Sequence, residues 1–399
     1  MTVNIAHILP WRSIGGTEHG TLRLADAVAG HYNSTIFYLK GASPVRGMFA
    51  HARFDTVAYE PIIPSYRHLK KFLQDSYALS QEFKRREIDI VHCSDILAGY
   101  HAAVAGRMAN LPVVCHVRSR YEEVSLREAN FLRAVNRFIF VSQDTWRRFG
   151  FRVPPRSGRV VYDGIDLWAH AGDLGVARQA KQAVLAEFGL PECTKIVGMV
   201  ARLAPEKDYE TLAKAAARIV AAHPHVRFLI VGDNSLEAVH REHYQKVRQT
   251  LAENGVAPFF VFTGFREDVP RIVSAMDVFV LSTHVEGFPL VILEALAQGK
   301  PVVATAVDGI PEIVHDEVTG LLFSHRDDVR LAAQVTSLFK IEGRAAALGQ
   351  AGREWVRANF TVERFATNMM NVYEGVVHSK GGRLRSELQP LRQIELARI

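Results

Sequence analysis

Residues 277–305 read DVFVLSTHVEGFPLVILEALAQGKPVVAT, and this stretch contains a complete strand–helix–strand unit. The apolar run DVFVLS predicts a buried strand, ILEALAQG predicts a helix that ends at a glycine, and PVVAT predicts a second buried strand. Two buried strands joined through a helix are typical of a parallel sheet. In such sheets ligands bind beyond the carboxyl ends of the strands, so the loop HVEGFP is the first place to search for function.

The same alternation of short apolar runs and helical stretches extends over most of the chain. The first half contains the expected strands VNIAHIL, STIFYL, IDIVHC, PVVCHV, RFIFVS and RVVY. After residue 190 the pattern restarts with KIVGMV, RFLIVG, FFVFTG, DVFVLS, PVVAT and GLLF. With 399 residues, 48% of them hydrophobic, the chain is long enough to bury two cores. We therefore predict an α/β protein of two tandem Rossmann-like, doubly wound domains.

A turn-prone stretch, residues 161–166, separates the two series of strands. We place the hinge there, because it lies between the last strand of the first series and a polar, Ala-rich helical stretch. Residues 1–165 then form the first domain and residues 166–360 the second, which begins with a linker helix at about 166–190.

Apolar side chains repeat at helical spacing near the end of the chain. They predict an amphipathic helix over residues 361–379 that packs on one of the domains. Residues 380–399 are Gly-led, Arg-rich and weakly patterned, which predicts a basic tail. Residues 40–85 and 118–135 show no pattern that we can interpret.

Basic residues are concentrated in the first domain. Residues 1–165 contain 22 Lys and Arg against 14 Asp and Glu, a net +8, whereas residues 166–399 contain 26 against 28, a net −2. Such an excess is compatible with a solvated face, with a site for anionic lipid headgroups, or with a site for a phosphorylated acceptor. Nucleic acid is disfavoured as a partner, because the basic residues are not interleaved with aromatic ones.

The sequence also bears on compartment. No apolar run approaches the roughly 18 residues that a membrane-spanning helix needs, and the start MTVNIAHILPW lacks the pattern of a signal peptide. We expect a cytoplasmic protein that binds at most peripherally to the inner face of the plasma membrane. Cys93, Cys115 and Cys193 have no paired spacing, so reduced thiols are expected.

Two loops that follow expected strands contain residues suited to phosphate. Gly15 and Gly16 precede an expected helix, where glycines let a ligand approach the backbone and the helix N-terminus favours anions. Arg202 and Lys207 follow KIVGMV, and a guanidinium with an ammonium suits two adjacent phosphates. Taken alone, the Gly15-Gly16 loop is more often an ordinary strand-to-helix turn, and Arg202 with Lys207 are more often solvated charges. A nicotinamide enzyme is disfavoured, since no Gly-x-Gly-x-x-Gly follows either strand.

Two carboxylates stand eight positions apart within residues 277–305. Glu286 lies in the loop and Glu294 in the helix, so we expect them to hold different parts of one ligand. Backbone N–H groups at the helix start attract an anion, while a helical carboxylate can accept hydrogen bonds from ribose hydroxyls. A nucleotide fits this arrangement.

Together these segments resemble the retaining glycosyltransferases of family 4, which have the GT-B fold of two Rossmann-like domains facing a central cleft. The resemblance rests on residues 286–305, with the two glutamates in the family's E-x7-E spacing, and on the loop 202–207. It implies an acceptor-side first domain and a second domain that binds a nucleotide diphosphate sugar. It further implies hexosyl transfer to a glycan or lipid-linked acceptor, in bacterial-type glycan, exopolysaccharide, lipopolysaccharide or glycolipid synthesis.

The resemblance assigns catalytic roles to four side chains. Arg202 and Lys207 would neutralise the donor diphosphate, and Glu286 would lie beside the transferred sugar. His116, which follows PVVC, would contact the same sugar. Retention implies front-face transfer, in which the departing phosphate oxygen takes the proton of the acceptor hydroxyl.

The resemblance also assigns the remaining donor contacts. Glu294 would hold the ribose, and the main chain near Phe265 and Arg266 would meet the base. The other predicted contacts are backbone groups near phosphate and sugar oxygens, at Gly15, Gly16, Gly287, Phe288 and Leu290. No Asp-x-Asp occurs, the pattern with which metal-dependent glycosyltransferases bind a cation, so we expect no metal and no cofactor beyond the nucleotide sugar.

Three positions depart from residues common in the family, and none of them removes a charged donor contact: Asp163, Ala201 and Asp208. Two other functions stay open at this point. A nucleotide-sugar epimerase can share the architecture and the diphosphate site, and a non-catalytic protein could bind the same ligand. The nucleotide base, the sugar and the acceptor are not predicted.

Overall fold

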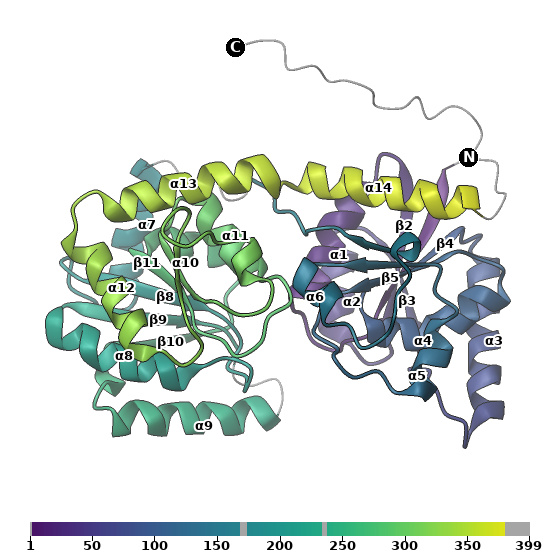
Figure 1. Cartoon of the computed structure of the whole chain (residues 1–399), viewed down its shortest axis with the longest axis horizontal. Helices are drawn as coiled ribbons and strands as arrows, with labels where there is room; N and C mark the ends of the chain where they lie inside the picture. Colours follow the sequence, from purple (N-terminus) through teal and green to yellow (C-terminus); the bar gives the residue numbers. More distant parts are fainter. Residues whose placement is uncertain (1, 168–173, 234–237, 380–399) are drawn as a thin grey trace, which may run out of the picture.

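The computed structural model describes residues 2–167, 174–233 and 238–379, which form two α/β units side by side (Figure 1). Each unit is built on one sheet in which all neighbouring strands are parallel. The two predicted doubly wound units are thereby confirmed. Residues 380–399, predicted as a basic tail, lie outside the described residues, as do residues 168–173 of the expected linker.

The first sheet has the strand order β3-β2-β1-β4-β5-β6-β7. Because the order reverses between β1 and β4, the carboxyl ends of these two strands mark its switch point. Its strands are β1 (Val3–Leu9), β2 (Tyr32–Leu39), β3 (Asp55–Tyr59), β4 (Ile90–Cys93), β5 (Val113–Val117), β6 (Arg137–Phe140) and β7 (Gly158–Val160). Its helices are α1 (Gly16–Ala27), α2 (Ser43–His51), α3 (Leu69–Arg85), α4 (Ile96–Met108), α5 (Leu126–Leu132) and α6 (Gln143–Arg147), with a 3-10 turn at Pro155–Ser157.

The second sheet has the order β10-β9-β8-β11-β12-β13, and its switch point lies between β8 and β11. Its strands are β8 (Lys195–Val200), β9 (Val226–Val231), β10 (Phe260–Gly264), β11 (Val278–Leu281), β12 (Val302–Thr305) and β13 (Leu321–Phe323). Its helices are α7 (Leu174–Glu187), α8 (Tyr209–Ala222), α9 (Ala238–Glu253), α10 (Val269–Ala275), α11 (Leu290–Ala297), α12 (Asp328–Lys340) and α13 (Arg344–Asn359). Two 3-10 turns, Ala257–Phe259 and Ile310–Glu312, complete it.

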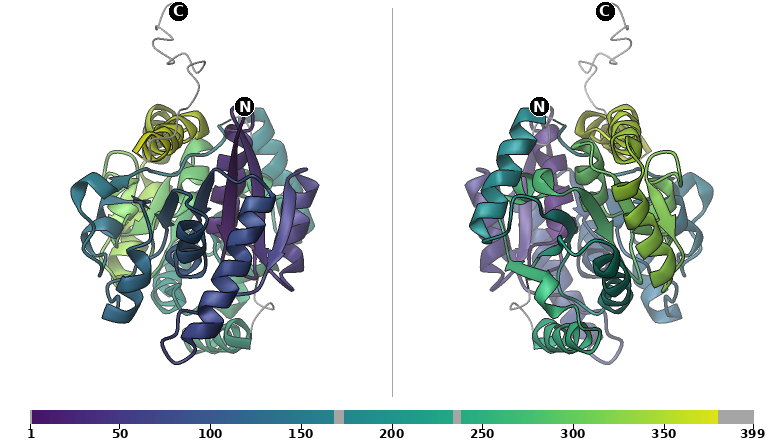
Figure 2. Two further views of the ribbon diagram at one scale, coloured as in Figure 1. Left: turned by 90° about the vertical axis from the view of Figure 1, so that its right-hand side faces the viewer. Right: turned by 90° about the vertical axis from the view of Figure 1, so that its left-hand side faces the viewer.

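Both faces of each sheet are covered, as the near-continuous apolar strands require. In β1 the side chains alternate, so that Ala6 and Ile8 pack with the helices on one face while Ile5 packs on the other. The second face of the first sheet is closed by α1 together with the last helix among the described residues, α14 (Val362–Ser379). Figure 1 shows α13 and α14 running in line along the top of both units, and Figure 2 shows the same pair nearly end-on.

The chain crosses between the units twice, and the two crossings lie side by side. Ile165 donates its N–H to the carbonyl of Phe360 at 2.9 Å, and Val362 donates to the carbonyl of Ile165 at 3.0 Å. At Gly164 a Cβ would lie 2.2 Å from the carbonyl oxygen of Thr361, so only glycine permits this approach. The second crossing returns the chain to the first unit, whose core therefore contains residues of both β1 and α14.

Two parts of the first unit were not predicted, and the shorter one, residues 118–135, contains α5. Residues 40–85, which showed no pattern, contain α2, β3 and α3. The strand β3 lies at the edge of the sheet, where burial is partial, and α3 includes the polar Ser76 and Ser80 on its buried face. Both features weaken the apolar periodicity that sequence analysis depends on.

Candidate active site

Main-chain hydrogen bonds join the loops after β8 and β11 at the switch point of the second sheet. Asp208 donates its N–H to the carbonyl of Ser282 at 3.1 Å, and His284 donates to the carbonyl of Glu206 at 2.8 Å. The hydroxyl of Thr283 donates to the same Glu206 carbonyl at 3.0 Å. Side chains on these two loops are therefore held at a fixed separation.

Lys207 and Glu286, predicted from separate motifs, form an ion pair on these loops. Their side chains are mostly buried, at 17% and 13% exposed. The N–H of Glu286 also donates to the carboxylate of Asp308 at 2.8 Å, and Arg120 of the first unit donates to the other oxygen of Asp308 at 3.2 Å. The structure thus brings together a predicted phosphate-binding cation and the predicted sugar-contacting carboxylate, and the other domain helps to position the second.

Glu294, predicted to hold a ribose, lies on α11 and is bound across the domain boundary. Arg23 on α1 donates to its carboxylate at 2.5 Å. The side chain of Arg23 is 19% exposed and that of Glu294 is 15% exposed. The second guanidinium nitrogen of Arg23, Nη1, is buried without a hydrogen-bond partner among the described residues. Sequence analysis missed Arg23, because nothing in its neighbourhood indicates which residue of the other domain it meets.

Arg202, the second predicted diphosphate ligand, follows β8 and is exposed. Within the described parts of the chain it forms no ion pair. The loop that bears it passes close over the end of β9, where a Cβ on Gly232 would lie 1.9 Å from the carbonyl oxygen of Ala201. Its charge is therefore available to a ligand, unlike that of Lys207.

Phe265 and Arg266 lie in the loop after β10, which turns at Gly264 with a φ of +71°. The ring of Phe265 is 61% exposed. The guanidinium of Arg266 forms two ion pairs, with Glu187 at 2.7 Å and with Asp268 at 2.8 Å. These hydrogen bonds raise the pKa of Arg266 and lower that of Asp268. A base at this loop would meet an exposed ring and main chain, which is the kind of contact that the resemblance implies.

Gly15 and Gly16 begin α1 beside the switch point of the first sheet. The N–H of Gly15 donates to the carboxylate of Glu18 at 2.9 Å, and burial of Glu18 raises its pKa to about 7. A Cβ on Gly16 would meet nothing within 4 Å, so packing inside the protein does not require glycine there. The absence of a side chain instead leaves the start of α1 open to a ligand. Glu18 was missed by sequence analysis.

Gly287 and its neighbours form a contact between the domains. A Cβ on Gly287 would lie 2.0 Å from the carbonyl oxygen of Arg118, so glycine is required there by the close approach of the first domain. Phe288 is buried against Tyr162 of the hinge, with ring centroids 5.2 Å apart, and Leu290 is the buried first residue of α11. Their predicted contacts to phosphate and sugar oxygens stay a prediction.

His116 is fully buried in β5 rather than exposed at the strand end. Its ring stacks on His92 at 5.7 Å and lies 6.2 Å from Phe365 of α14. Burial holds its pKa well below the usual range, so the ring is neutral. Its Nδ1 lies 3.3 Å from a guanidinium nitrogen of Arg118, which in turn pairs with Asp163 of the hinge. The structure therefore links His116 to the hinge, and its predicted contact with the donor sugar stays a prediction.

Comparison with known proteins identifies the family. A family model described as "Glycosyl transferases group 1" matches residues 181–355, and one described as "Glycosyltransferase Family 4" matches residues 14–168. The chain belongs to glycosyltransferase family 4. The first model covers Lys207, Glu286 and Glu294, and the second begins just before Gly15.

Named relatives of this family 4 chain match part of its length. The D-inositol 3-phosphate glycosyltransferase of Segniliparus rotundus is 32% identical over 233 residues, which span 58% of this chain and about half (50%) of that protein. The UDP-Gal:alpha-D-GlcNAc-diphosphoundecaprenol alpha-1,3-galactosyltransferase of Escherichia coli is 29% identical over 280 residues, 65% of this chain and 68% of that protein. Among solved structures, Anabaena Alr3699/HepE in complex with UDP and glucose superposes with a TM-score of 0.81 at 20% identity, covering 93% of this chain and 99% of that one. That likeness shows the GT-B fold.

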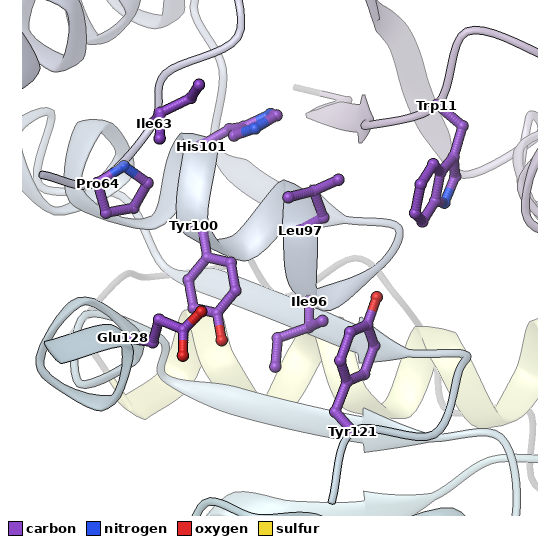
Figure 3. A pocket seen from close by; sticks show the side chains of 9 residues that line it. All are labelled: Trp11, Ile63, Pro64, Ile96, Leu97, Tyr100, His101, Tyr121 and Glu128. Atoms are coloured by element: carbon purple, nitrogen blue, oxygen red, sulfur yellow. The ribbon is translucent and has the colours of Figure 1, made fainter. Parts of the chain in front are cut away.

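A pocket of about 390 Å³ lies on the first domain of this family 4 protein. Figure 3 shows Trp11 on one side of it, Ile63 and Pro64 on the other, and Tyr100 and Tyr121 at its base. Trp11 follows β1 and the two tyrosines belong to α4 and to the loop after β5, so the pocket lies at the carboxyl edge of the first sheet. Aromatic and aliphatic lining suits an apolar or amphipathic ligand. Sequence analysis did not find this pocket, because its lining comes from segments without a motif.

Among the described residues, no helix is long and apolar enough to cross a membrane.

Proposed function

We propose that this family 4 protein transfers a sugar from a nucleotide diphosphate sugar to the hydroxyl group of a glycan or lipid-linked acceptor, with retention of configuration. The observation that carries the proposal is the ion pair between Lys207 and Glu286 at the switch point of the second sheet. Both the HepE structure, which is described with UDP and glucose, and the E. coli relative, named for UDP-Gal, support a nucleotide-sugar donor.

The donor-binding step follows from the charges on the two loops. Breaking the anomeric bond develops negative charge on the departing diphosphate, which Lys207 and the exposed Arg202 can neutralise. Because two fixed cations are available, we propose that transfer needs no metal ion. Glu286, released from Lys207 when phosphate arrives, is then free to accept hydrogen bonds from the sugar.

The transfer step balances without a covalent enzyme intermediate. The bond from the anomeric carbon to the phosphate oxygen breaks, and its electron pair stays with the diphosphate. The acceptor oxygen forms the new bond on the same face, and its proton passes to the departing phosphate oxygen. We propose that Glu286 and His116 orient the sugar, and the neutral, buried ring of His116 lies beside Arg118, which pairs with Asp163 of the hinge.

The pocket on the first domain supports an acceptor with an apolar part. Its aromatic rim, Trp11, Tyr100 and Tyr121, offers surfaces on which a sugar face or a hydrocarbon chain can pack. The carboxylate of Glu128 at the edge of the pocket can accept a hydrogen bond from an acceptor hydroxyl. The E. coli relative is named for a diphosphoundecaprenol-linked acceptor, which supports the same class.

A surface beside this pocket supports peripheral binding to an anionic membrane. Large apolar side chains are exposed along the start of α3 and in the segment before it, where Ile63 is 71%, Tyr66 50%, Leu69 42%, Leu73 40% and Tyr77 60% exposed. Exposed basic side chains stand among them: Arg67, Lys70 and Lys71. Apolar groups flanked by cations are typical of surfaces that enter the headgroup region of anionic lipid.

Vesicle binding tests the membrane part of the proposal. Cosedimentation with vesicles that contain anionic lipid should be lost in the double variant Leu69→Asp/Leu73→Asp and should weaken in high salt. The matched control is Val318→Asp/Val329→Asp, which places the same charges on exposed positions of the second domain. Equal binding by both double variants would contradict the assignment of this surface.

Donor binding and turnover test the central proposal. Thermal-shift screening with UDP-, GDP- and ADP-sugars should identify one donor class, and Lys207→Ala and Glu286→Ala should each lower transfer at least tenfold. Lys214→Ala, which removes an exposed lysine paired with Glu210 on α8, is the matched control and should retain full turnover. Wild-type turnover in both site variants, or an epimer of the donor as the product, would overturn the proposed function.

A further inference from the structure

Three side chains that commonly bind metal ions converge at the carboxyl edge of the second sheet, next to the proposed donor site. Asp208, His284 and His325 follow β8, β11 and β13 respectively, so they reach one place from three different loops. One ligand atom of each lies within 4.8 Å of the other two. Nδ1 of His284 is 2.6 Å from Nε2 of His325 and 3.8 Å from a carboxylate oxygen of Asp208.

The loops that bear two of these ligands are fixed by the rest of the fold. Asp208 is 2% exposed and caps α8, where its Oδ1 accepts the N–H of Thr211 at 3.0 Å and its Oδ2 accepts the hydroxyl of Thr211 at 2.6 Å. His284 is held through its main chain, as described above. Hydrogen bonds that orient a ligating carboxylate in this way are typical of metal sites.

The two imidazoles have an arrangement that suits a shared cation. Their rings are perpendicular with centroids 4.9 Å apart, and each directs a nitrogen toward the other. A hydrogen bond between them uses one lone pair and one N–H, and it leaves the Asp208 oxygen at 3.8 Å without a role in the pair. A cation among the three atoms would use all of them.

We propose that Asp208, His284 and His325 bind a Zn²⁺ ion, with the fourth position left to water. Zn²⁺ accepts two imidazole nitrogens and a carboxylate oxygen at about 2.0–2.2 Å, which places tetrahedral ligand atoms about 3.3 Å apart. Two of the three separations, 2.6 and 3.8 Å, lie on either side of that value, and the third is within 4.8 Å, so side-chain rotations would bring the three ligand atoms to these distances. His325 is exposed and His284 partly so, which gives the ion a path from solvent.

The bound ion would act on the loops rather than on the transferred sugar. Asp208 follows Lys207 directly, and His284 precedes Glu286 by two residues. A Zn²⁺ ion would therefore tie the two loops of the proposed donor site to the loop after β13. No step of the proposed transfer passes through this ion, so the zinc site goes beyond the proposed function.

Metal binding to the full-length chain tests this inference. Protein treated with EDTA and then desalted should bind one Zn²⁺ in calorimetric titration with ZnCl₂, and MgCl₂ should give no comparable heat. Zn²⁺ at about 100 times its Kd should raise Tm by about 3 °C. Absence of saturable Zn²⁺ binding to the wild-type chain would overturn the proposal.

Variants locate the ion. His284→Ala and His325→Ala should each weaken Zn²⁺ binding at least tenfold, and Asp208→Asn should do the same while keeping an oxygen to cap α8. His51→Ala, an exposed histidine on α2, is the matched control and should bind as the wild type does. Because His325 is exposed, its variant should keep the Tm of the EDTA-treated wild type. Wild-type affinity in His325→Ala would refute the site.

The two proposals can fail independently. Zn²⁺ binding is measured without any nucleotide sugar, so a failure to bind Zn²⁺ would overturn the zinc site and leave the proposed transfer activity standing. Loss of transfer in Lys207→Ala with Zn²⁺ binding retained would support both.

Discussion

We expect the substitution Arg23→Met to tighten the binding of the donor nucleotide. Arg23 pairs with the carboxylate of Glu294 at 2.5 Å, with about four-fifths of each side chain buried. If Glu294 binds the ribose as proposed, the donor must first displace this guanidinium. An exposed ion pair contributes about 0–1 kcal/mol, and burial strengthens the attraction but also adds a desolvation cost that offsets much of the gain, so we take about 1 kcal/mol for this partly buried pair. Removing the competitor should therefore lower the nucleotide Kd about fivefold.

A double-mutant cycle measured by calorimetric titration checks this magnitude. Arg23→Met should improve affinity in the wild-type background and have no effect in the Glu294→Gln background, where the competed carboxylate is absent. Arg330→Met removes an exposed pair with Glu317 in the second domain and is the matched control, with unchanged affinity. Weaker nucleotide binding in Arg23→Met would refute the reasoning, since it would make Arg23 itself a ligand of the donor.

Three further substitutions test individual contacts. Since burial raises the pKa of Glu18 from 4.5 to about 7, the folded chain favours the protonated form and loses stability as pH rises through that window. Glu18→Gln should remove this loss. The free energy of unfolding in urea should then differ less between pH 5 and pH 8 for the variant than for the wild type. Gly287→Ala places a Cβ 2.0 Å from a main-chain oxygen of the first domain and should lower transfer at least tenfold, whereas Gly47→Ala, with open space around it, should not. The hydroxyl of Tyr373 lies 2.6 Å from Nδ1 of His92 in the core, so Tyr373→Phe leaves that nitrogen unpaired. Urea unfolding should show that the free energy of unfolding falls by about 1–3 kcal/mol.

The strands could be predicted from the sequence because both faces of each sheet are covered. Strands such as β8 and β11 are buried from end to end, so their apolar runs are nearly continuous. The edge strand β3 has no such run and was missed. The final helix was predicted from its apolar face, but that pattern does not say which domain it covers. Packing of Phe365 and Tyr373 against the first sheet depends on where the chain crosses back at the hinge.

The candidate site was predictable only within each domain. Lys207 and Glu286 follow neighbouring strands of one sheet, so the topology alone places their loops together. The partners that come from the other domain, Arg23 and Arg120, depend on how the two domains dock, and no local pattern encodes that. The burial of His116 could not be predicted either, because its position at the end of an apolar strand does not reveal that α14 covers it.

Two carboxylates of the proposed donor site, Glu286 and Glu294, pair with cations of the protein itself, so a bound diphosphate would compete for one of these pairs. A pyrophosphate carries more negative charge than one carboxylate, so it should displace Glu286 from Lys207. Displacement turns a carboxylate that was neutralised by its partner into one that can bind the transferred sugar. Arg120 and Asp308 hold the backbone of Glu286 meanwhile, which lets its side chain be released without moving the loop. Under the proposed function, the sugar-contacting carboxylate therefore becomes available only once the diphosphate is in place, and the ion pair protects the site from binding sugars that carry no phosphate.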